Sequence, residues 1–179
     1  MDLSSETELV EAAQGGCLES FAALYKRYYG AMVALGYSVL DDIHLAEDAA
    51  QQSFAIACGD LSKLKSKEKF GCWLAGICRN VAKQMRRRQG RQSALDESVT
   101  ATPKRDSFDC TVRQAVWSLK PFYREPIVLR YYDNLPYEQI GNVLGISVQA
   151  VNGRLIRAKK KIKKYLERNG ITGGDYESV

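Results

Sequence analysis

The sequence predicts an all-α protein built from two small helical domains that a flexible linker joins. Apolar residues recur at the three- and four-residue spacing of helices along most of the chain. Alternating runs rich in β-branched residues, which would indicate strands, are absent from the sequence. A segment poor in large apolar residues divides the chain, and 179 residues suffice for one medium domain or two small ones.

Residues 1–88 form the first predicted domain, a bundle of four helices. The segment ETELVEAAQ opens the first helix, and Gly15 and Gly16 end it because glycine readily takes positive φ angles. The third and fourth helices run through LAEDAAQQSFAIAC and FGCWLAGICRNVAKQMRRR. The second helix runs through SFAALYKRYYGAMVALGYSVL, and its apolar positions at helical spacing are Phe21, Leu24, Tyr25, Tyr28, Met32 and Leu35.

Residues 89–110 form the predicted linker. Their sequence, QGRQSALDESVTATPKRDSFDC, is rich in Ser, Thr and charged residues and has neither helical nor strand periodicity. Residues 111–168 form the second predicted domain, and residues 169–179 form a short tail that is also expected to be flexible.

The second domain contains a helix-turn-helix pattern. Pro121, Pro126 and Pro136 indicate early turns of helices, where a missing N–H group costs little. In NVLGIS, Gly145 can end one helix with a positive φ, and Ser147 can cap the next by accepting a hydrogen bond from a free N–H. The helix that follows has one apolar stripe, which consists of Val151, Leu155, Ala158, Ile162 and Leu166.

The formal net charge of +5 is distributed unevenly along the chain. Residues 1–62 carry ten acids and two bases, which sum to −8. Residues 63–88 carry nine bases and one acid, and residues 111–168 carry twelve bases and four acids, so each region sums to +8. Two basic regions favour an anionic partner such as a nucleic-acid backbone, which releases counterions when basic side chains bind it.

The segment SVQAVNGRLIRAKKKIKKY, residues 147–165, carries seven Lys or Arg residues and no acid. A charge run is often only a solvated helix face, but solvated faces normally mix both signs of charge. The short turn before this segment instead favours a helix that enters the DNA major groove. We expect base contacts from its first turns and phosphate contacts from its later ones, and the candidates are Ser147, Gln149, Asn152, Gly153, Arg154, Arg157, Lys160 and Lys161.

Other functional classes find little support in the sequence. No nucleophile–base pair, phosphate-binding loop or ligand cluster is recognisable, so we expect no enzyme, small-molecule substrate, cofactor or metal. The five cysteines form no C-x-x-C pair and none lies within a few residues of His44, the single histidine, which favours free structural thiols. Neither a signal-peptide pattern nor a long apolar run occurs, so a cytoplasmic protein is expected.

Four motifs in register resemble the extracytoplasmic-function sigma factors of bacteria. They are ESFAALYKRYY, AEDAAQQSF, FGCWLAGICRNVAKQMRRR and, after the linker, YREPIVLRYYDNLPYEQIGNVLGISVQAVNGRLIRAKKKI. The resemblance runs from about Leu9 to Leu166. It implies a dissociable, non-catalytic subunit of RNA polymerase that recognises promoter DNA and starts its melting, and it implies an anti-sigma protein as a further partner.

The resemblance also implies roles for individual residues. AEDAAQQSF matches the helix that binds the clamp helices of the largest polymerase subunit, through Asp48 and Gln51 with Glu47 and Gln52 beside them. The second domain matches the part that reads the minus-thirty-five element as duplex DNA. The fourth helix of the first domain matches the one that handles the minus-ten element, with base contacts expected from Asn80, Lys83 and Gln84 and phosphate contacts from Arg79, Arg86, Arg87 and Arg88.

The segment GDLSKLKSKEK matches a loop that captures a base flipped out of the DNA stack. Trp73 is a candidate aromatic partner for that base, because flipped bases stack on aromatic rings. Its helical spacing with Phe70, Leu74 and Ile77 favours a core position instead, and Phe54 is also expected in the core.

Three residues depart from the family pattern. Gln84 stands where the family commonly has Asp, and Gly153 replaces a common serine, which leaves one expected DNA contact without a side chain. Gly141 replaces a small alanine at a helix-propensity cost of ~1 kcal/mol. A free-standing helix-turn-helix regulator is the alternative function, and it explains residues 111–168 but not the first domain.

Overall fold

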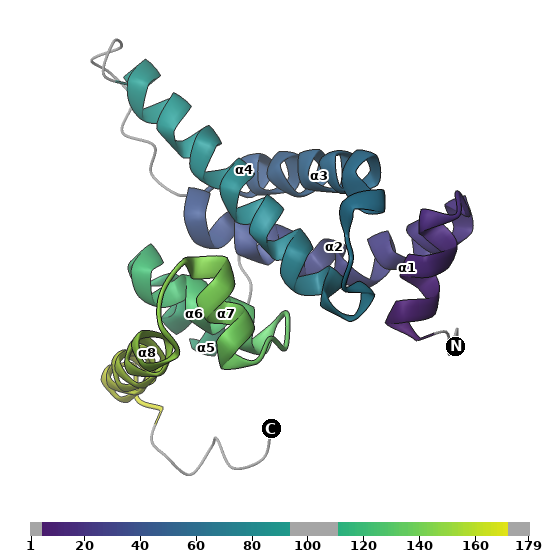
Figure 1. Ribbon diagram of the computed structural model, residues 1–179. Helices are drawn as coiled ribbons and strands as arrows, with labels where there is room; N and C mark the ends of the chain where they lie inside the picture. Colours follow the sequence, from purple (N-terminus) through teal and green to yellow (C-terminus); the bar gives the residue numbers. More distant parts are fainter. Residues whose placement is uncertain (1–4, 94–110, 172–179) are drawn as a thin grey trace.

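The computed structural model describes residues 5–93 and 111–171, and every regular element within these two ranges is a helix (Figure 1). The helices fall into two groups that we call the N-terminal body, residues 5–93, and the C-terminal body, residues 111–171. The predicted all-α class with two helical units is therefore confirmed.

The N-terminal body is built around one long helix. Its helices are α1 (Glu6–Gln14), α2 (Leu18–Leu40), α3 (Ile43–Asp60) and α4 (Phe70–Ser93), and two 3₁₀ turns at Leu61–Lys63 and Lys67–Lys69 connect α3 to α4. Helix α2 packs against α1, α3 and α4. Local sequence fixes the starts of two helices: Ser5 and Glu8 form a reciprocal capping box on α1, and the Asp42 carboxylate accepts from the Leu45 N–H to cap α3.

Apolar residues of the predicted stripes fill the centre of this body. Leu24, Met32 and Leu35 of α2 are completely buried, as are Phe70 and Leu74 of α4. Phe54 is buried beneath the Phe21 and Tyr25 rings, as expected. Trp73 is half-buried with its ring 6.0 Å from that of Phe70, which agrees with a core position.

The C-terminal body contains the helix-turn-helix. Its helices are α5 (Thr111–Trp117), α6 (Pro121–Tyr131), α7 (Tyr137–Leu144) and α8 (Val148–Arg168). Gly145 ends α7 with φ 68° and ψ 42°, and the Ser147 hydroxyl accepts from the Ala150 N–H at 3.2 Å to begin α8. The predicted stripe of α8 faces inward: Val151, Leu155, Ala158 and Leu166 are buried, and Ile162 is half-buried.

Two details differ from the sequence-based expectations. Helix α4 continues to Ser93, so the first five residues of the expected linker are helical, and residues 94–110 lie outside the described part. Pro126 is wrong as a marker of an early turn, because it is the sixth residue of α6 and lies in its interior. Helix α8 ends at Arg168, and residues 172–179 of the expected tail also lie outside the described part.

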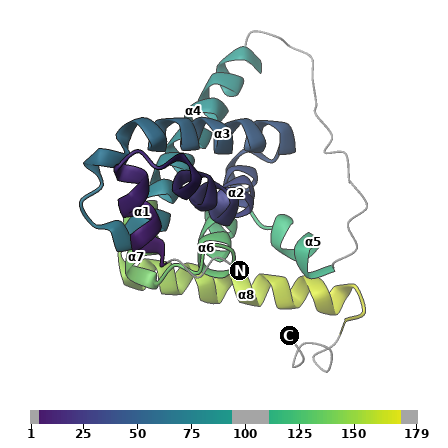
Figure 2. The same ribbon diagram turned by 90° about the vertical axis from the view of Figure 1, so that its right-hand side faces the viewer.

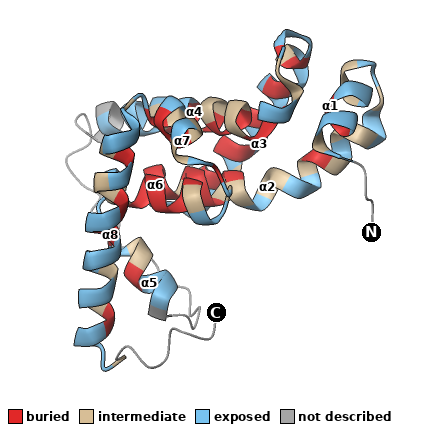
Figure 3. Cartoon of the chain, turned by 60° about the horizontal axis from the view of Figure 1, so that its bottom comes forward, coloured by how far each residue is buried: buried red, intermediate tan, exposed pale blue. Residues whose placement is uncertain are grey.

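The two bodies pack directly against each other. Helix α6 lies along α2, and α7 lies against α4, while α8 crosses on the outer side of the C-terminal body (Figure 2). Buried apolar side chains form one continuous cluster that runs from α1 into α8. Figure 3 shows α6 buried along much of its length between the N-terminal body and α8. The ring of Tyr37 in α2 meets that of Trp117 in α5 edge-on, with centroids 4.7 Å apart.

A buried carboxylate lies in the loop between α6 and α7, close to the N-terminal body. Both oxygens of Asp133 are inaccessible to solvent and have no hydrogen-bond partner among the described residues. Burial raises the pKa of Asp133 to about 7. Two groups of the N-terminal body also have raised pKa values, Cys78 to about 12 and Tyr28 upward. Burial is the main cause for both, and the negative charge of Asp133 adds a smaller contribution.

We predict that Asp133→Asn makes the protein more stable at neutral and alkaline pH. An unfolded aspartate has a pKa of about 3.9, whereas folding raises this value to about 7. The wild-type protein therefore keeps its full stability below pH ~4, where Asp133 is protonated in both states. It loses stability as the pH rises to ~7, because the folded state then has to bury a charged carboxylate. Asparagine does not titrate. The gain in unfolding free energy of the variant should therefore grow with pH, to the order of 4 kcal/mol at pH 8.

Chemical denaturation of both proteins at several pH values between 4.5 and 8.5 measures this difference. Asp48→Asn serves as the control, because it neutralises an exposed carboxylate on the outer face of α3. A gain from Asp133→Asn that stays the same at every pH would contradict the prediction.

Candidate nucleic-acid interface

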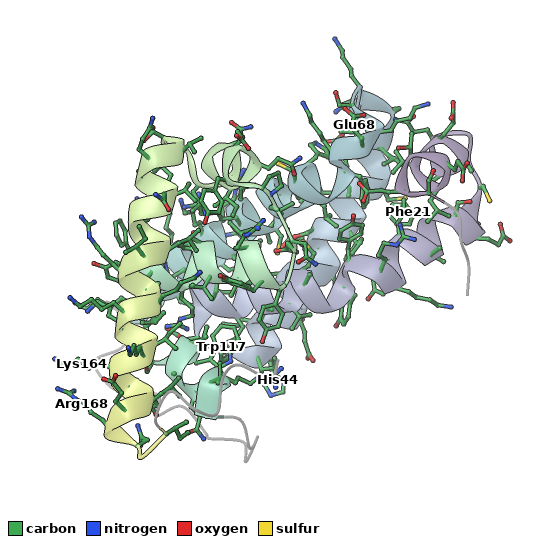
Figure 4. The ribbon with its side chains drawn as sticks, turned by 90° about the horizontal axis from the view of Figure 1, so that it is seen from below. Phe21, His44, Glu68, Trp117, Lys164 and Arg168 are labelled. Carbon is green, nitrogen blue, oxygen red and sulfur yellow. The ribbon has the colours of Figure 1, made fainter. Side chains whose placement is uncertain are left out.

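Helix α8 presents a basic face to solvent at the edge of the C-terminal body. Its apolar stripe faces α5, α6 and α7, which leaves the opposite side free. Lys164 and Arg168 point away from the helical body in Figure 4. The predicted residues that lie exposed on α8 or at its cap are Ser147, Gln149, Asn152, Arg157, Lys160 and Lys161, while Gly153 is half-buried.

Arg154 is held in place by a neighbouring helix. Its guanidinium carbon lies 3.7 Å from the centre of the Phe122 ring in α6, a stacking contact that orients the planar group. Lys161 lies near Tyr123 of the same helix, with its ammonium nitrogen 5.4 Å from the ring centre. Both cations therefore lie at the side of α8 that adjoins α6, and Arg154 is only half-exposed.

Two apolar residues of α8 were missed by the sequence-based prediction of contacts. Ile156 is 59% exposed and Val148 is 38% exposed, and both lie in line with Asn152 at four-residue spacing. Neither residue belongs to the buried stripe. Their apolar character at positions outside the stripe was the sequence signal that could have identified them as surface contacts. Exposed apolar side chains on such a face can contact thymine methyl groups in the major groove.

The turn between α7 and α8 depends on Gly141. A Cβ atom at this position would lie 2.8 Å from the carbonyl oxygen of Ile146, which is closer than van der Waals contact permits. The Ile146 N–H in turn donates to the Gly141 carbonyl at 3.0 Å. Glycine at position 141 therefore allows the turn at Ile146 to lie close against α7, which fixes how α7 and α8 are placed relative to each other. This packing benefit offsets the low helix propensity of glycine.

Helix α4 divides its predicted DNA-contacting residues between two faces. Asn80, Gln84, Arg87 and Arg88 are exposed on the outer face of the helix. Arg79 and Lys83 lie on the side that turns toward the C-terminal body, where the pKa of Lys83 is lowered by burial and by nearby Arg79. Arg86 is exposed, and its guanidinium also donates to the Val39 carbonyl of α2 at 3.4 Å.

Arg79 is not available to solvent in this structure. Its Nε donates to a carboxylate oxygen of Glu125 in α6, and its Nη1 donates to the Val143 carbonyl of α7 at 3.2 Å. Only 11% of the Arg79 side chain and 10% of the Glu125 side chain are exposed. The structure therefore separates Arg79 from the exposed arginines with which the sequence grouped it.

Helix α3 carries the predicted polymerase-binding residues on its outer side. Asp48, Gln51 and Gln52 are exposed, and Glu47 is half-exposed. The inner side of the same stretch consists of small buried residues that pack on α2 and α4: Ala46, Ala49, Ala50 and Ser53. The small side chains bring α3 close to its neighbours and leave the polar residues as a separate face.

The segment that precedes α4 is anchored on both sides. The side-chain amide of Gln14 in α1 donates to the carbonyls of Leu61 and Leu64, both at 2.9 Å. Lys67 pairs with Glu11 of α1 at 2.7 Å. Lys63, Lys65 and Lys69 remain exposed, so the segment is a shaped loop with basic side chains on its surface.

Three other observations bear on the chemistry of the chain. Cys17, Cys58, Cys72 and Cys78 are free thiols, and Cys110 lies outside the described residues. Within residues 5–93 and 111–171, no three metal-binding side chains gather at one place. None of the helices in these ranges has the length and apolar character that crossing a bilayer requires.

Two family models match the two bodies. Residues 24–92 match sigma-70 region 2, and residues 111–162 match sigma-70 region 4. Each match covers the helices that carry one of the two basic faces. The same chain therefore contains the helix-turn-helix and a second domain that is typical of sigma factors. The alternative of a free-standing helix-turn-helix regulator is not favoured.

Curated relatives and solved structures agree with these matches. The chain is 29% identical to the RNA polymerase sigma-H factor of Pseudomonas aeruginosa, over 90% of this chain and 94% of that one. It is 27% identical to the extracytoplasmic-function sigma factor SigW of Bacillus subtilis, over 88% and 94% respectively.

Among solved structures, the fold is similar to that of CnrH in its complex with the cytosolic domain of CnrY. The TM-score is 0.68 at 24% identity, with 93% of this chain and 99% of the other covered. It is also similar to RpoE of Bartonella quintana in complex with the anti-sigma factor NepR, with a TM-score of 0.70 at 22% identity over 84% and 98%.

The chain belongs to the sigma-70 class of transcription initiation factors. Within that class it is an extracytoplasmic-function sigma factor, an alternative sigma subunit through which RNA polymerase starts transcription.

Proposed function

We propose that this sigma factor binds core RNA polymerase through the outer face of α3 and contacts promoter DNA through α4 and α8. The observation that carries the proposal is the presence of two exposed basic helix faces on two separate bodies, each within a sigma-70 region. Residues 1–88 would act on the minus-ten element and residues 111–168 on the minus-thirty-five element, while residues 89–110 and 169–179 would serve as linker and tail.

The C-terminal body reads duplex DNA in this proposal. The first turns of α8 present Gln149 and Asn152, whose side-chain amides can pair with base edges in the major groove. Ser147 and Gly153 lie beside them, with Arg154 at the edge of the same surface. Arg157, Lys160 and Lys161 then contact phosphates, which fixes the orientation of the helix on the DNA.

The N-terminal body handles the DNA where the strands separate. Asn80, Lys83 and Gln84 are proposed to contact bases, and Arg86, Arg87 and Arg88, together with Arg79 once it is released, are proposed to contact phosphates. Unpairing costs a few kcal/mol per base and is offset when the protein holds the displaced strand, so melting requires binding and no covalent step. The protein acts as a non-catalytic subunit and needs no cofactor.

Polymerase supplies the geometry that the free chain lacks. Glu47, Asp48, Gln51 and Gln52 are proposed to contact the clamp helices of the largest polymerase subunit. Two DNA-binding bodies on one chain gain affinity from their effective concentration only when their spacing matches that of the two DNA elements. Promoter selectivity should therefore depend on core polymerase.

An anti-sigma protein is a further proposed partner, and the cytoplasm is the proposed place of action. Two structural neighbours, CnrH and RpoE, are described in complexes, with the cytosolic domain of CnrY and with the anti-sigma factor NepR. The fold of this chain is similar to both, which supports a comparable regulator for it.

In vitro transcription with purified core polymerase tests the proposal. The chain should enable core polymerase to initiate at promoters from its own genome, whereas neither the chain alone nor the core enzyme alone should yield specific transcripts. A free-standing regulator would be favoured instead if core polymerase with the chain never initiated transcription and the free chain bound DNA tightly and sequence-specifically at physiological salt.

We predict that Asp48→Arg abolishes binding to core polymerase and leaves the fold intact. Asp48 is exposed on the outer face of α3, so a reversed charge would disrupt charge complementarity with a partner on that face without disturbing the buried side. Co-purification with polymerase measures binding, and circular dichroism measures helix content. Glu138→Arg is the matched control, because it reverses an exposed acid in the other body, and undiminished binding of Asp48→Arg would refute the assignment.

We predict that Arg157→Ala weakens binding of the holoenzyme to the upstream promoter element at all sequences alike. Arg157 is exposed on α8 beyond the base-reading turns, where a phosphate contact releases counterions. Loss of one such contact should reduce the slope of log affinity against log salt concentration by about 1. Salt titrations on two promoters measure the slope, and a change in preference between the promoters would instead identify Arg157 as a base-reading residue.

A further inference from the structure

We propose that Phe122, a residue of α6 outside the helix-turn-helix, is a positioning residue for promoter recognition. Its ring holds the guanidinium of Arg154 in one orientation, which prepares the N–H edge of that group for a guanine in the major groove. The inference rests on the proposed function, since it takes α8 to be the helix that reads duplex DNA. The observation that suggests it is the close stacking of this arginine on an exposed ring.

The contact between Arg154 and Phe122 is a direct one. The guanidinium carbon lies 3.7 Å from the ring centre, whereas the other cation–ring distances given by the described residues are 5.4 to 5.6 Å. A separation of 3.7 Å is van der Waals contact, and the negative face of the ring attracts the cation. Arg154 therefore has less conformational freedom than a solvated arginine.

Stacking leaves the hydrogen-bonding groups of Arg154 free. The five N–H donors of a guanidinium lie in its plane, so a ring against one face blocks none of them. Arg154 is half-exposed, and within residues 5–93 and 111–171 its side chain makes no hydrogen bond or ion pair. Arg79 and Arg124, by contrast, each donate to a carboxylate and a carbonyl. Arg154 is thus oriented but still able to bind.

The Phe122 ring stands on a rigid support. Pro121 opens α6 and fixes its own φ angle, and residues 124–129 of the same helix are buried. The Phe122 ring also meets the Tyr123 ring edge-on, with centroids 5.1 Å apart and an interplanar angle of 89°. Backbone and neighbouring ring together restrict the orientation of Phe122, which in turn restricts that of Arg154.

The same turn of α6 contacts a second cation of α8. The ammonium nitrogen of Lys161 lies 5.4 Å from the centre of the Tyr123 ring. Arg154 and Lys161 are seven residues apart, which is about two helical turns, so both lie on one side of α8. The rings of Phe122 and Tyr123 therefore place two proposed DNA contacts, one from the early and one from the later turns of the helix.

Core packing does not explain the aromatic residue at position 122. Phe122 is 49% exposed and does not belong to the cluster of buried apolar side chains. Its removal should therefore cost little stability, in contrast to the removal of a core residue such as Leu155, which is only 2% exposed. A substitution at position 122 can thus report on DNA recognition in a protein that remains folded.

The expected effect is on sequence preference. An arginine that donates two hydrogen bonds to O6 and N7 of guanine makes the commonest specific contact in the major groove. A guanidinium that is already oriented loses less entropy when it forms this contact. Without the ring, we expect discrimination at the base pair that Arg154 reads to fall by ~5-fold, the magnitude of one cation–ring interaction.

Single base-pair substitutions in the upstream promoter element test the proposal. Competition binding with holoenzyme measures discrimination at each position, and Arg154→Ala identifies the base pair that Arg154 reads. Phe122→Leu should lose discrimination at that same base pair, whereas Phe122→Tyr keeps a ring and should behave as the wild type. Tyr132→Leu is the matched control, because it removes an exposed ring from the other end of α6.

Nuclear magnetic resonance of the free chain tests the stacking without polymerase or DNA. A ring at van der Waals distance shifts the Nε–H and Cδ proton resonances of Arg154 upfield. This shift should disappear in Phe122→Leu and remain in Phe122→Tyr. Arg157, which is exposed and contacts no ring among the described residues, is the internal reference. Arg154 resonances that do not respond to Phe122→Leu would overturn the inference.

The binding outcomes separate this inference from the proposed function. A wild-type holoenzyme that prefers its promoter, together with unchanged discrimination by Phe122→Leu, would overturn the inference alone. Equal weakening at all sequences by Phe122→Leu or Arg154→Ala would also overturn it, since Arg154 would then read no base. The double variant Phe122→Leu with Arg154→Ala should discriminate no less than Arg154→Ala, and a further loss would show that Phe122 acts on DNA by itself. A wild-type holoenzyme without any promoter preference would overturn the proposed function and the inference with it.

Discussion

Helix α2 is the element on which the whole arrangement depends, because helices of both bodies bury apolar surface against it. One side packs on α1, α3 and α4, and α6 lies along it from the C-terminal body. Met32 and Leu35 are completely buried in a cluster that continues into α8. The exposed polar side of α3 and the basic helix α8 are thus positioned relative to one shared helix.

Charged groups within this apolar frame decide which relative placement the two bodies adopt. Apolar burial is not directional and would stabilise several relative placements, whereas the guanidinium groups of Arg79 and Arg124 each require a carboxylate and a carbonyl at defined positions. The ion pairs therefore select one placement rather than adding much stability. Asp133 acts in the opposite sense, since burying its unpartnered carboxylate costs free energy when the two bodies pack together.

The sequence could predict the helices and the outer faces because both follow local rules. Helical periodicity, the caps at Ser5 and Ser147 and the glycine at position 145 identify elements within a few residues of where they occur. Contacts between residues far apart along the chain have no such signal. The partners Arg79 and Glu125 are 46 positions apart, so Arg79 was indistinguishable from the arginines that remain exposed, and the close approach at Gly141 depends on a turn whose geometry only the fold supplies.

The stacking of Arg154 on Phe122 has a consequence for how promoter preference can diverge within such a protein. The aim of an arginine in the recognition helix is set by a ring that belongs to a different helix and is itself half-exposed. A substitution at position 122 would redirect that arginine while every residue of the recognition helix stayed the same. Two paralogues with identical recognition helices can therefore differ in the sites they occupy, and comparisons limited to that helix would overlook the difference.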